Sequence, residues 1–184
     1  MVASIWRGVM GLVVMLGLMG GLAQPVSATL TDDRYDGNIF ALYGGNGSLV
    51  PPRLSIDQSR ALDRPSVVVY YLDDSADCKR FSPVLNEVQA FYSRKISIVP
   101  VPADLVAFAK ESGKMTEELR FYRGVVPQTV VLNTAGEVVF DRAGLVSFGE
   151  LDTVFQETLG LSPVVNPKIK PRDPNARQIN EINP

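Results

Sequence analysis

Cys78 is the residue of this chain best suited to nucleophilic or redox chemistry. The 184 residues include one cysteine and no histidine. Without an imidazole, Ser-His and Cys-His nucleophiles and histidine-rich metal sites are excluded. A single thiol can form neither an internal disulfide nor a tetrahedral thiolate zinc site. Three possibilities remain for Cys78: a buried apolar side chain, a thiol that forms mixed disulfides with a partner or glutathione, and an intermolecular bridge.

The segment around Cys78 joins an expected strand to an expected helix. The apolar run at residues 66–72 predicts a buried strand. After Cys78, apolar residues recur at spacings of three and four, which predicts a helix with one buried face: Phe81, Val84, Leu85, Val88 and Phe91. Pro83 interrupts this pattern near its start and is expected to bend the helix.

The rest of the chain supplies the elements that must position this segment. Patterns predict strands at 96–101, 129–132 and 137–141, and helices at 54–62, 105–122 with a break around residues 112–113, and 148–159. The apolar run 38–43 could be a further strand before the glycine-rich turn 44–47. This order predicts an α/β fold, a central mixed sheet with helices on both faces.

Two motifs give this chain its resemblance to the thioredoxin-like superfamily. The first is Ser75-Ala76-Asp77-Cys78-Lys79 with Pro83, which is similar to the family's pair of cysteines, lysine and helix proline. The second is Val125-Val126-Pro127-Gln128-Thr129, which is similar to the family's cis-proline loop. The resemblance implies a thioredoxin-like domain over residues 54–162. It also implies a groove beside Val126 and Pro127 that can bind extended segments.

The departures from the family pattern concern catalysis. Ser75 stands where the family has its attacking cysteine, Asp74 where it has a tryptophan, and Val69 where it has a buried acid. The carboxylates of residues 73, 74 and 77 are expected to raise the pKa of a nearby thiol. The resemblance therefore implies a protein without dithiol turnover, in which Ser75 is a degenerate nucleophile position and no catalytic residue is established. The alternative is a monothiol oxidoreductase that uses Cys78.

Both ends of the chain carry separate signals. Residues 1–28 combine Arg7, an apolar run at 8–23 and small residues before position 29, which predicts a secretory signal peptide or an uncleaved membrane anchor through residues 8–23. Residues 29–53 form an N-terminal extension, and the proline-rich residues 163–184 predict a disordered tail. The formal net charge of −2 argues against a nucleic-acid partner.

With its export signal, degenerate site and aromatic extension, the chain resembles cyanobacterial thylakoid thioredoxin-like proteins associated with photosystem I accumulation. That resemblance implies a non-catalytic factor without a cofactor or metal, in the thylakoid lumen or on the thylakoid membrane. Its partner would be a membrane protein complex, photosystem I or its assembly intermediates. The periplasm is the alternative location. The aromatic part of the extension is expected either to add a β-hairpin to the sheet or to form a patch that contacts the partner.

Overall fold

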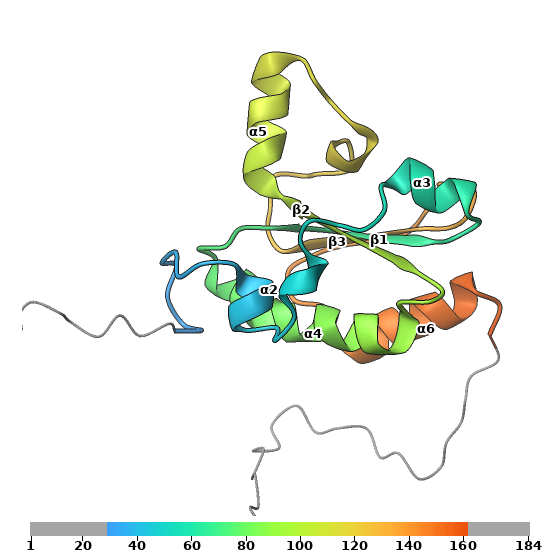
Figure 1. The fold of residues 1–184 in the computed structure, drawn as a ribbon, viewed down its shortest axis with the longest axis horizontal. Helices are drawn as coiled ribbons and strands as arrows, with labels where there is room; N and C mark the ends of the chain where they lie inside the picture. The colour runs from blue at the N-terminus through green and yellow to red at the C-terminus, as the bar shows by residue number, and fades with distance from the viewer. Residues whose placement is uncertain (1–28, 162–184) are drawn as a thin grey trace, which may run out of the picture.

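The computed structural model describes residues 29–161 (Figure 1). The signal peptide or anchor predicted at 1–28 and the tail predicted at 163–184 lie outside the described residues. Four strands form one sheet in the order β2-β1-β3-β4, with β1 at Ser66–Tyr71, β2 at Ser97–Pro102, β3 at Gln128–Leu132 and β4 at Val138–Ala143. β1 is parallel to β2 and antiparallel to β3, and β3 is antiparallel to β4. The predicted mixed sheet is confirmed.

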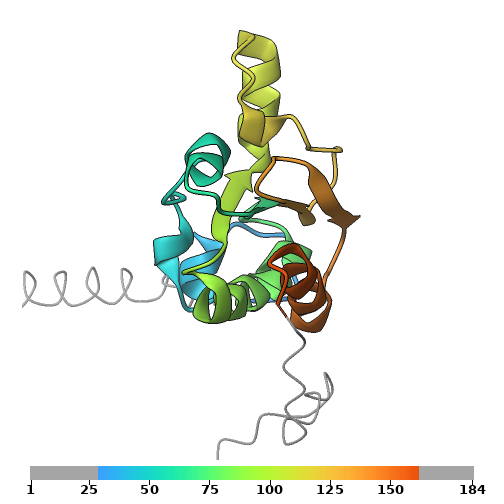
Figure 2. The same ribbon diagram turned by 90° about the vertical axis from the view of Figure 1, so that its right-hand side faces the viewer.

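Helices cover both faces of this sheet. α4 (Ala76–Tyr92) connects β1 to the parallel strand β2 and shares one face with α6 (Phe148–Thr158) and the short α2 (Ile39–Leu42). α3 (Ile56–Ala61) and α5 (Ala103–Ser112) lie over the opposite face, and α5 projects away from the sheet in both views (Figures 1 and 2). Two 3-10 turns complete the described elements, η1 (Gly47–Leu49) and η2 (Glu117–Leu119). The α/β thioredoxin-like fold class is confirmed.

The protein has two hydrophobic cores, one on each face of the sheet, and β1 contributes side chains to both. Each of its residues is at most 2% exposed. Val67, Val69 and Tyr71 pack on the side of α4 and α6, whereas Val68 and Tyr70 pack on the side of α3 and α5. A strand covered on both faces needs a continuous apolar run rather than an alternating one, which is why this strand was predictable from residues 66–72. The end of β1 is thereby held in place, and the loop after it leads into α4.

α4 runs without a break through Pro83. A proline inside a helix cannot donate to the carbonyl four residues earlier, which here belongs to Lys79. The Ser82 hydroxyl donates to that carbonyl at 2.9 Å and replaces the missing bond. The helix therefore accommodates Pro83, although this residue lies inside the helix, about two turns after its start.

The expectation that residues 38–43 could be a strand is wrong, because they contain α2. The Asn38 side chain caps this helix by accepting a hydrogen bond from Ala41 N at 3.0 Å. Ile39 and Phe40 are both buried in the same core, whereas consecutive residues of a strand point to opposite faces. A Cβ at Gly44 would lie 3.0 Å from the carbonyl of Ser82, so a glycine here lets the end of α2 approach α4 closely.

The two interpretations of the aromatic extension also change. The extension adds no hairpin to the sheet, whose described strands are the four above. Phe40 cannot belong to a surface patch because it is 1% exposed, although Tyr35 and Leu42 of the same segment are exposed. Within residues 29–161 no helix is long and apolar enough to cross a membrane.

Candidate functional site

The start of α4 holds both residues of the degenerate Ser-x-x-Cys motif. Ser75 is the N-cap residue of the helix, and its Oγ accepts a hydrogen bond from Cys78 N at 3.3 Å. Serine is among the preferred residues at this position because its hydroxyl satisfies a backbone N–H that has no partner within the helix. Cys78 is 1% exposed and packs into the core beside α2 and α6. The two residues thus lie together as expected, with Ser75 acting as a helix cap.

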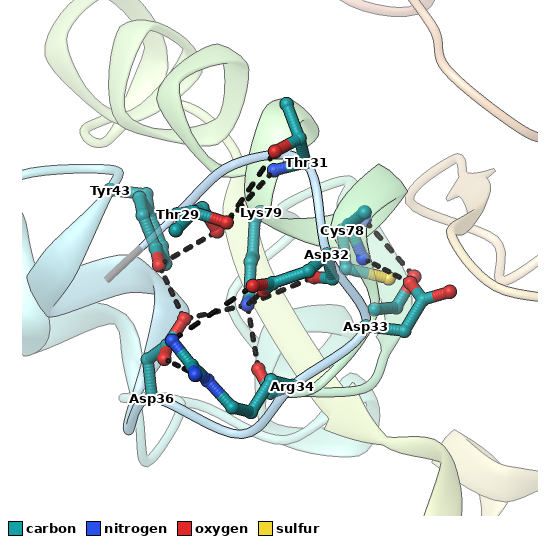
Figure 3. A network of polar contacts seen from close by, with 11 residues as sticks. Thr29, Thr31, Asp32, Asp33, Arg34, Asp36, Tyr43, Cys78 and Lys79 are labelled. Carbon is teal, nitrogen blue, oxygen red and sulfur yellow. Dashed lines mark hydrogen bonds and ion pairs between the residues drawn. The ribbon is translucent and has the colours of Figure 1, made fainter. Parts of the chain in front are cut away.

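The N-terminal extension covers this helix start (Figure 3). Asp33 Oδ1 accepts a hydrogen bond from Ala76 N, the first residue of α4, at 2.8 Å. A second hydrogen bond has its donor in the extension: Ile39 N donates at 3.0 Å to Oδ1 of Asp73, which lies in the loop between β1 and α4. A carboxylate at a helix N-terminus also interacts favourably with the helix dipole. The positive end of α4 is therefore occupied by the chain itself.

Lys79, which follows the cysteine, is fully buried and ties the extension to α4. Its ammonium lies 2.7 Å from Asp36 Oδ2 and 3.2 Å from Asp32 Oδ1. It also contacts two backbone carbonyls of the extension, that of Asp32 at 3.1 Å and that of Arg34 at 2.6 Å. Figure 3 shows the ammonium enclosed by these oxygens. A buried ammonium requires such partners, so residues 32–36 complete the surroundings of α4.

Tyr43, the residue that follows α2, belongs to the same network. Its hydroxyl lies 2.6 Å from Asp36 Oδ2 and 3.0 Å from the carbonyl of Thr29, and its ring faces the Lys79 ammonium at 5.6 Å. Hydrogen bonds from Lys79 and Tyr43 lower the pKa of Asp36 to about 2. Burial opposes the charge on Lys79, but its hydrogen bonds with Asp36 and Asp32 outweigh this and raise its pKa. Both groups are consequently charged at neutral pH.

Burial raises the pKa of the Cys78 thiol. Hydrogen bonds involving Ser75 and the backbone of Leu72 act in the opposite direction, and the charges of Asp77 and Asp74 raise the pKa further. The expected acidic effect is therefore present, but the removal of the thiol from water is the larger cause. A thiol is a nucleophile only as its thiolate, and this environment disfavours the thiolate.

Three acidic side chains near Cys78 already have hydrogen-bond or ion-pair partners within the chain. Asp33 and Asp73 accept backbone N–H groups, and Asp77 pairs with Arg80. Within residues 29–161, no group of three or more His, Cys, Asp or Glu side chains is arranged to hold a metal ion.

The predicted proline loop lies beside the same helix start. The Val126–Pro127 peptide bond is cis, as the resemblance implies. β3 begins one residue later, and Gln128 lies opposite Tyr70 of β1 in the antiparallel pair. The loop before β3 is therefore next to the loop that leads from β1 to α4. Pro127 is buried, while Val125 at the rim is 45% exposed.

The site also contains residues whose roles were missed by the sequence patterns: Asp32, Asp33, Asp36, Tyr43 and Lys79. The sequence patterns placed residues 32–43 only within the N-terminal extension, and the lysine was recognised only as part of the family motif. The ion pair between Lys79 and Asp36 joins positions 43 residues apart. Helix and strand periodicities relate near neighbours, so no local spacing rule could have paired these residues.

The strand order, the crossover through α4 and the cis proline before β3 define a thioredoxin-like protein whose first active-site cysteine is replaced by a serine. The chain is 43% identical over 156 residues to the thylakoid membrane protein slr1796 of Synechocystis sp., covering 82% of this chain and 77% of the relative. The chain belongs to the family of that protein.

Among solved structures, similarities to thioredoxins are weaker. A mutant thioredoxin from Halobacterium salinarum shares 19% identity over 59% of this chain and 86% of its own, with a TM-score of 0.44. The thioredoxin NaTrxh from Nicotiana alata shares 23% identity over 55% of this chain and 79% of its own, with a TM-score of 0.41. A comparison with protein-family models finds no match. The fold assignment rests on the topology described above.

Proposed function

We propose that this chain is a non-catalytic thioredoxin-like protein of the thylakoid that binds a membrane protein complex and assists its assembly or accumulation. Photosystem I and its assembly intermediates are the partners proposed first, and the lumenal side of the membrane is the proposed location. The relative named as a thylakoid membrane protein supports the choice of membrane. The loop at Val126 and Pro127 is the proposed contact site, because its edge can pair with an extended segment without any thiol chemistry.

The occupied N-terminus of α4 is the observation that carries the non-catalytic assignment. Dithiol exchange requires an exposed thiolate at this position and a second thiol to resolve the mixed disulfide. Here Ser75 caps the helix, Asp33 binds its first N–H, and Cys78 is 1% exposed. Each of these three features removes a requirement of the reaction.

An insulin-reduction assay with dithiothreitol tests the absence of turnover. We expect the protein to reduce insulin no faster than dithiothreitol alone, and we expect Cys78→Ser to behave in the same way. A conventional thioredoxin serves as the positive control. Turnover comparable to that control which disappears in Cys78→Ser would overturn the assignment in favour of the monothiol oxidoreductase.

Affinity capture from solubilised thylakoid membranes tests the partner. We expect the tagged full chain and its Cys78→Ala variant to recover the same photosystem I polypeptides. Val125→Arg should reduce recovery, because it places a charge at the rim of the proposed contact site. Val139→Arg is the matched control, since Val139 is also 45% exposed but lies on β4 and not in the proline loop.

Different outcomes of the capture have different meanings. Loss of the partner in Cys78→Ala, with an unchanged circular dichroism spectrum, would indicate a mixed disulfide and contradict a thiol-independent contact. Equal loss in Val125→Arg and Val139→Arg would contradict the placement of the contact at the proline loop. Recovery of a different membrane complex would retain the binding function and reject photosystem I as the partner.

A further inference from the structure

A pocket of about 340 Å³ lies at the open edge of the sheet, away from Cys78 and the proline loop. Its lining includes the start of β2, an edge strand of the sheet, together with residues next to α3 and at the end of α4. These two helices lie on opposite faces of the sheet (Figure 2). Its apolar lining is formed by Leu49, Leu54, Leu62, Ile96 and Ile98. This volume is at the lower end of the range of small-molecule sites, about 300–1,000 Å³.

The backbone of β2 limits what can bind along this edge. Ser97 N donates to the carbonyl of Pro65 on the β1 side, so the alternate residues 98, 100 and 102 direct their backbone groups outward. Two of these three residues are Pro100 and Pro102, which have no N–H. Ile98 alone offers an outward N–H along β2. A full additional strand cannot pair here, and the edge is suited to a ligand that needs one backbone donor.

Polar donors converge on the same place. Arg64 Nη2 donates to the carbonyls of Ser93 at 2.6 Å and Ile96 at 3.2 Å, which fixes its guanidinium beside β2. Ser97 is 5% exposed. Within the described residues, neither Arg64 Nε nor Ser97 Oγ has a hydrogen-bond partner. Buried polar groups normally have one, so these two atoms indicate a missing acceptor.

The charge of the lining identifies the kind of acceptor. Arg53 and Arg64 both line the pocket, and no acidic residue does. The chain as a whole carries a formal net charge of −2, so this local excess of positive charge is not a general property of the protein. We propose that the pocket binds an amphipathic anion, a carboxylate or phosphate joined to a short apolar body. The anion would accept hydrogen bonds from Arg64, Ser97 and Ile98, and the apolar body would lie against the leucines.

Photo-crosslinking of the full chain in a neutral sugar detergent tests this site. The probe is a medium-chain fatty acid that carries an aliphatic diazirine, and mass spectrometry locates the labelled peptides. We expect labelling of the peptides that contain Leu62 and Ile98. Decanoate and decyl phosphate should compete, and whichever competes better identifies the head group. Decanol, which has the same apolar body and no charge, should compete at least tenfold more weakly, as expected for the loss of a charge-assisted hydrogen bond.

Three variants distinguish this site from general adsorption. Arg64→Gln should reduce site labelling by about tenfold or more, and the exposed Arg53→Gln by roughly two- to fivefold. Leu62→Trp should reduce labelling by filling the pocket, and Leu62 is 58% exposed, so the fold should accept the larger side chain. Arg94→Gln is the control, because Arg94 is exposed and does not line the pocket.

The proposal is overturned if labelling maps elsewhere, if decanol competes as well as decanoate and decyl phosphate, or if Arg53→Gln and Leu62→Trp label like Arg94→Gln. Melting curves by circular dichroism show whether each variant remains folded. Because Arg64 also binds backbone carbonyls, an unfolded Arg64→Gln leaves the decision to the other two variants. The site is independent of the proposed partner contact, so neither result decides the other.

Discussion

The substitution Phe40→Ala tests whether the N-terminal extension is part of the folding core. Phe40 is 1% exposed and contacts Tyr71 of β1 edge-to-face, with 4.8 Å between ring centroids. Removing a buried phenylalanine side chain typically destabilises a protein by about 3–5 kcal/mol, which includes the cavity left behind. Small domains have total stabilities of about 5–15 kcal/mol. We therefore expect Phe40→Ala to remove a large fraction of the free energy of unfolding.

Urea unfolding followed by far-UV circular dichroism measures this loss, and Phe91→Ala is the matched control. Phe91 is 70% exposed, although its ring lies 5.3 Å from that of Phe148. An aromatic pair contributes about 0.5–1.5 kcal/mol, so Phe91→Ala should have a much smaller effect than Phe40→Ala. The slopes of the unfolding transitions should be similar, which allows the midpoints to be compared directly.

The result that refutes the reasoning is a loss for Phe40→Ala no larger than that for Phe91→Ala. The extension would then be a separable appendage, and the folding unit would begin near residue 54, where the motif resemblance begins. A biphasic transition in the unchanged chain, with the first phase lost in Phe40→Ala, would also show that the extension unfolds independently of the sheet.

Three further predictions concern the start of α4. Ser75→Ala should lower the free energy of unfolding by about 1 kcal/mol through loss of the N-cap, as measured in urea. Cys78 should react slowly with a thiol reagent in the native protein and rapidly in denaturant. In the native protein the reaction should become faster only at a pH above the usual thiol pKa, because burial raises the pKa of Cys78. Fast labelling of the native protein near neutral pH would contradict this. The lowered pKa of Asp36 stabilises the fold above the pKa of an unfolded aspartate, about 4, and this stabilisation should disappear as pH falls toward about 2. Asp36→Asn should lack that part of the pH dependence in acid unfolding curves.

The sheet and its main helices could be predicted because their signals are local. Residues 66–72 form a continuous apolar run, and the apolar spacing after Cys78 marks one face of α4. The observed bounds of β1 and β3 differ from the predicted ones by one residue at one end. The cis proline followed from the family motif and its position before β3.

The extension was harder to predict because its structure depends on distant residues. Ile39 and Phe40 are apolar in either a strand or a helix, and the choice is made by the Asn38 cap and the core beneath them. The carboxylates of Asp32 and Asp36 resemble ordinary surface charges until Lys79 is placed between them. The pocket beside β2 depends on residues from four separate segments. None of these arrangements produces a periodic pattern.

The replacement of the nucleophile and the covering of α4 by the extension have one electrostatic explanation. In a dithiol site the thiolate is stabilised by the positive N-terminus of the helix that it opens. Here the Asp33 carboxylate accepts the hydrogen bond from the first N–H of α4. Two anions cannot share that helix end without repulsion, so an aspartate can occupy it only where position 75 is uncharged. A cysteine at position 75 alone would therefore remain a poor nucleophile while Asp33 stays in place, since the helix end that would stabilise its thiolate already holds a carboxylate.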